Sequence, residues 1–213
     1  MGRKPEGHDV AQPPSPGYGE PRRSSPEEPA SGGGGSSLAS TAGLTACATA
    51  EGVAVDPQQL LALAVDAARG GDVDTLSRAL AAGVPIDATS PRGDSLLMLA
   101  CYYGHAGAVQ LLLEKGADAN QPDGKGQSPL SGVAFKGLID VAGLLVSRGA
   151  IVDASSADGR TALMMAAAFN RVEMVAWLLR HGATADARDA AGLRAVDVAR
   201  AMGANDVVAI LPD

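Results

Sequence analysis

The stretch GRTALMMAAAFNRVEMVAWLLRHGATADA, residues 159–187, contains the pattern that decides the fold. Thr161 can cap a helix over 162–169, because its side-chain oxygen can accept a hydrogen bond from a free N–H of the first helical turn. Asn170 tolerates a left-handed backbone and is expected to end that helix. A second helix is predicted over 172–180, because apolar residues recur there at helical spacing. They are Val172, Val175, Leu178 and Leu179.

This unit recurs every 33 residues, which predicts a repeat array from residue 58 onward. Three columns of residues show the step without slippage. One column holds Gly93, Gly126, Gly159 and Gly192. Another holds Gly83, Gly116, Gly149 and Gly182, and a third, at the end of the first helix, holds Gly71, Gly104, Gly137, Asn170 and Gly203. A single unit cannot bury its apolar stripe, whereas stacked neighbours can, so the units are expected to form a solenoid.

The columns define five units. An N-terminal cap covers 58–89 and begins with a helix over 57–69; complete repeats cover 90–122, 123–155 and 156–188; a truncated C-terminal cap covers 189–213. Arg194, Asp197 and Arg200 provide the polar outer face that a terminal repeat needs. The middle repeat is expected to be the least stable, because Gly132 and Gly143 fall inside its helices and each costs about 1 kcal/mol relative to alanine.

Residues 1–57 differ in composition, with eight Pro, ten Gly and seven Ser, and are predicted to form a disordered tail. Leu44-Thr45-Ala46-Cys47 resembles a lipobox, which leaves export or lipid anchoring through the Cys47 region as an alternative. The segment before it is polar and rich in proline, so a tail on a cytoplasmic protein is the favoured interpretation. No run approaches the ~20 apolar residues of a membrane span.

The unit resembles the ankyrin repeat. Residues 113–120, LEKGADAN, are very similar to the LLL-x-x-GAD-x-N segment of that family, and Gly104-His105 is similar to its GH pair. The resemblance covers about 58–213 and implies an all-α solenoid of helix–turn–helix units with hairpin-like loops. The TPLH tetrapeptide of the family is degraded, and the loss of its histidine implies the loss of hydrogen bonds between repeats. The corresponding tetrapeptides start at Ser95, Ser128, Thr161 and Arg194.

The family architecture implies that a ligand contacts the concave side, at the loops and the outward ends of the first helices. Four of the six aromatic residues fall in the two positions that precede the helix-ending Gly or Asn. These are Tyr102, Tyr103, Phe135 and Phe169; the other two are Tyr18 and Trp177. Aromatic side chains dominate binding hot spots, so we expect a contact stripe here, with packing between repeats as the alternative. Its polar border is expected to comprise Lys136, Asp94, Gln127 and Arg160. Trp177 is predicted to lie in the core.

Catalysis and metal binding are not expected. The only histidines are His8, His105 and His181, and the repeat pattern brings no nucleophile to a base. Cys101 and His105 lie four residues apart, but further ligands for a zinc site are absent, and Cys101 is predicted to be a small core residue. Recurring aspartates in the loops are interpreted as turn formers. They are Asp118, Asp153, Asp186 and Asp189. No cofactor is predicted.

The net charge of −7 and the pI of about 4.9 argue against nucleic acid as a partner, since nucleic-acid-binding proteins usually carry a basic face. Residues 58–213 alone hold 13 basic and 17 acidic residues, a net charge of −4. The sequence therefore predicts a monomeric, non-catalytic module that binds another protein. An alternative is a regulatory or inhibitory subunit of an enzyme whose tail reaches a second site.

Overall fold

The computed structural model describes residues 56–211, which form ten helices. The predicted tail up to residue 55, with Tyr18 and the Cys47 region, lies outside the described residues. The helices are α1 (Pro57–Gly70), α2 (Val73–Ala81), α3 (Leu96–Tyr103), α4 (Ala106–Glu114), α5 (Pro129–Lys136), α6 (Ile139–Ser147), α7 (Ala162–Ala168), α8 (Val172–Arg180), α9 (Ala195–Met202) and α10 (Asn205–Val208). Residues 56–211 contain no β-strand, which confirms the all-α prediction.

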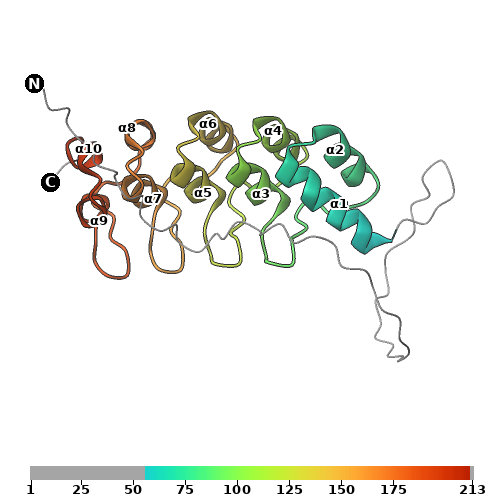
Figure 1. Cartoon of the computed structure of the whole chain (residues 1–213), viewed down its shortest axis with the longest axis horizontal. Helices are drawn as coiled ribbons and strands as arrows, with labels where there is room; N and C mark the ends of the chain where they lie inside the picture. The colour runs from blue at the N-terminus through green and yellow to red at the C-terminus, as the bar shows by residue number, and fades with distance from the viewer. Residues whose placement is uncertain (1–55, 212–213) are drawn as a thin grey trace, which may run out of the picture. The chain divides into compact units, whose positions relative to one another are not determined.

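The helices are paired and arranged in two rows. The first helices of the pairs (α1, α3, α5, α7, α9) lie in one row and the second helices (α2, α4, α6, α8, α10) in another, with loops projecting from the first row (Figure 1). Each helix packs on its partner, and each first helix also packs on the first helix of the next pair. The chain therefore stacks helix pairs along one direction, as the 33-residue step predicts.

Side chains and backbone conformation set where the first helices begin and end. The side-chain oxygens of Ser95, Ser128 and Thr161 accept hydrogen bonds from backbone N–H groups three residues later, at 3.1, 3.3 and 3.4 Å. Asn170 is left-handed, with φ 53°, in the column where the other units have glycine, because asparagine tolerates this conformation better than most residues. Helix α7 ends at Ala168, one residue earlier than predicted, and Phe169 forms its cap.

Small residues allow the first helices to pack closely. Ala100, Ala166 and Ala199 occupy one column, and each is fully buried. One turn earlier in the first helices, Leu97, Leu130, Leu163 and Val196 are also buried, so the core is continuous along the stack. Trp177 is 8% exposed, which confirms its predicted place in the core. Its ring stacks on the imidazole of His181, with centroids 3.8 Å apart.

Four loops, which we call the finger loops, have one repeated structure. They run over Ser90–Asp94, Asp123–Gln127, Ser156–Arg160 and Asp189–Leu193. In each, the first residue and the last are joined by a backbone hydrogen bond of 2.8 to 3.0 Å. The side chain of the first residue also accepts the N–H of the last, as Asp123 does from Gln127 at 2.8 Å. The fourth residue is a left-handed glycine in all four loops, with φ +84° at Gly93, a conformation that glycine adopts without steric cost.

Neighbouring repeats are joined by hydrogen bonds that the sequence did not predict. At the ends of the first helices, His105 Nε2 donates to the Arg69 carbonyl at 2.8 Å, and Arg171 Nε donates to the Phe135 carbonyl at 3.1 Å. Asn170 donates to Asp206 at 2.8 Å and accepts the N–H of Val207 at 3.2 Å. The degraded TPLH segment therefore does not leave the repeats without polar contacts, because other side chains supply them.

The loop aspartates do not all form turns. Asp118 and Asp189 do, accepting N–H groups two residues later at 2.9 Å. The prediction is wrong for Asp153 and Asp186. Asp153 accepts both the N–H and the hydroxyl of Thr184, at 3.0 and 2.7 Å, and so joins two repeats. Asp186 lies 3.6 Å from a guanidinium nitrogen of Arg194.

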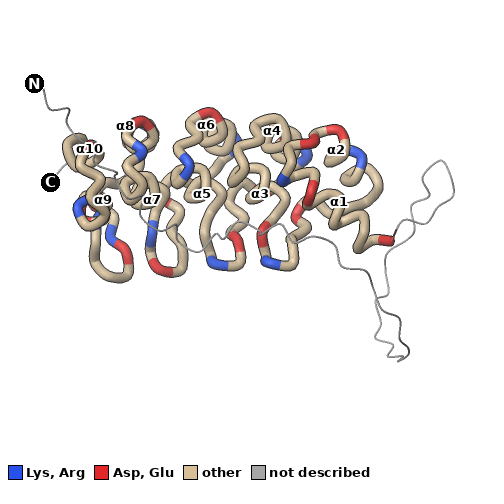
Figure 2. Tube along the Cα trace, in the orientation of Figure 1, with Lys and Arg blue, Asp and Glu red and all other residues tan. Residues whose placement is uncertain are grey.

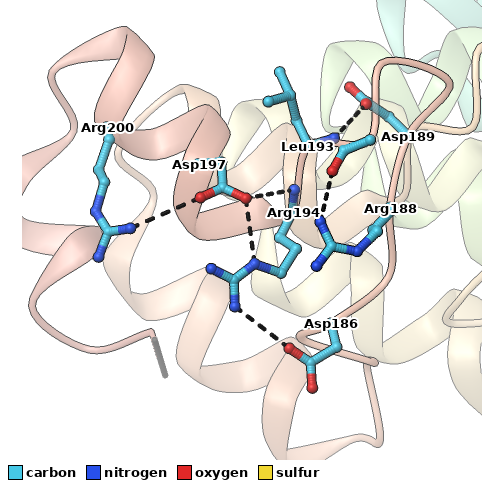
Figure 3. Close-up of polar contacts among 8 residues, drawn as sticks. Asp186, Arg188, Asp189, Leu193, Arg194, Asp197 and Arg200 are labelled. Atoms are coloured by element: carbon cyan, nitrogen blue, oxygen red, sulfur yellow. Dashed lines mark hydrogen bonds and ion pairs between the residues drawn. The ribbon is translucent and has the colours of Figure 1, made fainter.

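The C-terminal cap is organised around the carboxylate of Asp197 (Figure 3). It accepts the backbone N–H of Arg194 at 3.0 Å and that residue's Nε–H at 3.2 Å, and it lies 3.7 Å from Arg200. The Arg194 backbone N–H, followed by its guanidinium, lowers the pKa of Asp197 below the ordinary aspartate value. The polar residues predicted for this cap therefore interact mainly with one another.

We expect amide protons of 127–147 to exchange faster than those of 160–180. Gly132 and Gly143 lie within α5 and α6, and each should lower the stability of its helix by about 1 kcal/mol relative to alanine. Hydrogen exchange followed by mass spectrometry measures both segments in one sample. Equal protection of the two segments would contradict a weak middle repeat.

The Gly143→Ala variant tests whether helical glycine is the reason for faster exchange in the middle repeat. A Cβ added there would meet no atom within 4 Å, so this change should raise protection in 127–147 and stabilise the chain by about 0.5–1 kcal/mol. Gly137→Ala is the opposing control, because φ is +81° at Gly137 and an added side chain there would be strained.

Asp197→Asn should make stability less dependent on pH. The lowered pKa means that the ionised carboxylate stabilises the fold fully above the ordinary aspartate value of about 3.9, and that this contribution is lost as the pH falls through the lower folded value. The denaturant midpoints of the two proteins should therefore differ at pH 7 and converge toward pH 2. Glu114→Gln is the control, because its ion pair with Arg148 is long (3.9 Å) and exposed. A constant difference between Asp197→Asn and the parent at all pH values would refute the assignment.

Candidate functional site

The candidate site lies at the ends of the first helices. Tyr102 and Tyr103 are the last two residues of α3, Phe135 and Lys136 are the last two of α5, and Phe169 caps α7. Each pair directly precedes the left-handed residue that ends its unit's first helix. Because the first helices pack side by side, these positions line up across three repeats. We call the four aromatic residues Tyr102, Tyr103, Phe135 and Phe169 the aromatic ladder.

The rings of the aromatic ladder are in contact from one repeat to the next. The centroids of Tyr102 and Phe135 lie 6.3 Å apart with nearly parallel planes, at 6°. Phe135 meets Phe169 edge to face, with centroids 4.3 Å apart, and Tyr102 meets Tyr103 in the same way at 5.4 Å. The structure therefore brings all four predicted aromatic residues together.

The ladder is partly packed and partly open. Tyr103 is 49% exposed, whereas Tyr102, Phe135 and Phe169 are half-buried. Burial, with a smaller contribution from Tyr103, raises the pKa of the Tyr102 hydroxyl. Packing between repeats, the alternative interpretation, thus accounts for part of the ring area and leaves another part available for contact. Met202, 47% exposed, continues the column of Tyr103 and Phe169 at the C-terminal end.

Lys136 is the charged member of the site. Its Nζ lies 4.5 Å from the centroid of Tyr102 and 5.6 Å from that of Phe135. A cation over the faces of aromatic rings is attracted by their quadrupoles, by about 0.5–1 kcal/mol at exposed positions. Lys136 therefore adds a positive charge over the aromatic rings of the ladder.

The other three predicted border residues lie elsewhere. Asp94, Gln127 and Arg160 are the last residues of their finger loops, just before the first helices begin. The ladder lies at the opposite ends of the same helices. About eight residues at 1.5 Å each separate the two sets by ~12 Å. The 33-residue step aligns the border residues with one another and the ladder residues with one another, but the two sets lie at opposite ends of the helices. Asp94, Gln127 and Arg160 therefore do not border the ladder directly.

Arg171 and His105 belong near the ladder and were not predicted there. Both follow the left-handed residue of their units, and both donate to a carbonyl at the end of the preceding first helix. The His105 ring also lies parallel to that of Tyr103, with centroids 6.4 Å apart. In the sequence, only the Gly104-His105 pair marked one of these two positions, and only the contacts show that both residues flank the aromatic ladder.

The projecting loops carry both signs of charge (Figure 2). Arg160 forms an ion pair with Asp158 at 3.2 Å within one finger loop, and Arg194 reaches Asp186 in the loop before it at 3.6 Å. Charges of opposite sign lie close together, so the described loops do not form a continuous basic stripe of the kind that phosphate backbones need.

Cys101, His105 and His181 are engaged in the fold. Cys101 is fully buried, and this burial raises the pKa of its thiol, whereas nucleophilic and metal-binding cysteines are thiolates. His181 bonds through Nδ1 to the Trp177 carbonyl at 2.8 Å. Residues 56–211 contain no group of three potential metal ligands, and none of their helices is long and apolar enough to cross a membrane.

The Cys101 thiol should be almost inert in the folded protein. In a Cys47→Ser background, its reaction with Ellman's reagent should be at least about 100-fold slower than in denaturant, because it requires opening of the core around α3. The control protein carries Cys101→Ala together with Ser147→Cys at an exposed position, and the thiol introduced at position 147 should react rapidly. Rapid labelling of Cys101 without denaturant would show that the core opens easily.

Two family models match the chain. A model of three ankyrin repeats matches residues 63–156, and a single ankyrin repeat matches residues 158–190. A putative ankyrin repeat protein of Pseudomonas aeruginosa is 48% identical over 57 residues, which cover 27% of this chain and 33% of that relative. The matched residues span the stacked helix pairs and the aromatic ladder described above. The chain belongs to the ankyrin-repeat family.

Proposed function

We propose that this chain is a non-catalytic module that binds a protein partner on the concave face expected for this family, with the aromatic ladder as the main contact. Ankyrin repeats are generally protein–protein interaction modules, and the family is typically non-catalytic. The single observation that carries the proposal is the contact of four aromatic rings across three repeats. A core does not require this arrangement, because the small and leucine columns already fill the stack.

The ladder has the properties of a binding hot spot. Tyrosine and phenylalanine bury a large area at a modest cost in side-chain entropy. Contacts within the ladder hold Tyr102, Phe135 and Phe169 in place before a partner arrives, which reduces the entropy lost on binding. The exposed ring of Tyr103 and the charge of Lys136 provide the accessible parts.

We further propose that the protein is cytoplasmic, because its described cysteine, Cys101, is a free buried thiol, and that it acts as a monomer. Sedimentation of the purified chain checks the monomer, and intact-mass measurement of the native protein checks for a lipid. A dimer, or an added lipid mass, would contradict these two statements.

The Tyr103→Ala, Phe169→Ala double variant should lose partner binding. Affinity purification from the native source identifies the partner, and calorimetry with that partner should show an affinity at least about 30-fold lower for the double variant, as for hot-spot residues worth 2 kcal/mol or more. Ile151→Ala with Ile210→Ala is the matched control, because both side chains are exposed and lie away from the ladder. Full affinity in a folded double variant would exclude the ladder as the site.

A further inference from the structure

Two cationic residues meet the C-terminal end of α5, in the middle of the ladder. Lys136 is the last residue of that helix, and the Arg171 side chain reaches back from the next repeat to donate to the Phe135 carbonyl at 3.1 Å. Both residues are exposed. The aliphatic part of Arg171 also lies against Gly137, directly after Lys136. The pair is thus held in place by contacts between two repeats.

Neither cation has a carboxylate partner among residues 56–211. The ion pairs there involve other residues. Asp140 and Glu173 line a shallow pocket beside Gly137, but the ion pairs of the described residues include neither of them. The carbonyl end of α5 offsets roughly half a unit of positive charge. The two cationic side chains at this helix end therefore remain outside any ion pair of the described residues, although the repeat domain as a whole is negative.

The charge is specific to this point of the stack. The column of Lys136 holds Gly70, Tyr103, Phe169 and Met202 in the other units. Lys136 therefore stands between two aromatic residues of its own column, with its Nζ over the ring of Tyr102. A ligand that covers Tyr103 and Phe169 must pass over Lys136, and an apolar ligand would remove that charge from water without compensation, which is costly.

We infer that the partner presents an extended peptide segment in which a carboxylate side chain lies between apolar side chains. The carboxylate pairs with Lys136 and Arg171, and the apolar side chains cover Tyr103 and Phe169. This inference rests on the proposed function and adds the chemistry of the partner. A nucleic-acid ligand, whose phosphates would also suit the two cations, is disfavoured by the net charge of −4 that residues 58–213 carry.

The test uses the full chain and a phage library of random 16-residue peptides. Selected peptides should be enriched in Asp and Glu next to apolar residues, relative to the input library. For a synthetic selected peptide, Lys136→Gln should lower the affinity about fivefold and should weaken its dependence on salt. Lys136→Glu should prefer the peptide with its carboxylate replaced by lysine. Arg171→Lys, which keeps the charge, should bind nearly as the parent does.

Lys115→Glu is the matched control, because Lys115 is an exposed lysine on the second-helix row and its reversal changes the net charge equally. Selected peptides without acidic enrichment, bound equally by Lys136→Glu and Lys115→Glu, would overturn the inference. If their binding still required Tyr103 and Phe169, the proposed function would stand. If the double variant Tyr103→Ala, Phe169→Ala bound the peptides with the affinity of the parent, the proposed function would instead be refuted. Preferential binding of a single-stranded oligonucleotide, or failure to select any peptide, would overturn the inference that the ligand is a peptide segment.

Discussion

Close approach of the first helices is the constraint on which the rest of the structure depends. Fully buried alanines such as Ala100 and Ala166 leave room for neighbouring helices to pack directly on one another. Residues two or three positions later in each helix are then brought into register from repeat to repeat. For this reason Tyr102, Phe135 and Phe169 contact one another at 4.3–6.3 Å, although 33 or 34 residues separate them along the chain.

Much of the fold followed from the sequence because the signals were local and repeated. Each unit carries its own cap, its own left-handed residue and its own apolar stripe, so five copies support one interpretation. The aromatic ladder was predictable for the same reason, since it occupies fixed columns. The bounds of α7 were missed by one residue because Phe169 and Asn170 share the change from helical to left-handed backbone.

Contacts between units were harder to predict. Asp153 looked like a turn residue, yet it binds Thr184 in the following repeat. Asp94, Gln127 and Arg160 repeat at the same period as the ladder, but a period does not reveal which end of a helix a residue occupies. The hydrogen bond of Arg171 to the Phe135 carbonyl joins two columns that are unrelated in the sequence. Such pairings depend on the three-dimensional stacking of the units, which a list of columns does not contain.

Asn170 illustrates how a departure from the repeat changes the behaviour of the whole. A glycine would satisfy the backbone at this position, as in the other four units, but it would have no side chain. The amide of Asn170 both donates to Asp206 and accepts from Val207, so the residue that ends α7 also holds the start of α10. Fraying of α7 at Asn170 would break both of these hydrogen bonds, so the stability of the terminal cap is coupled to that of α7.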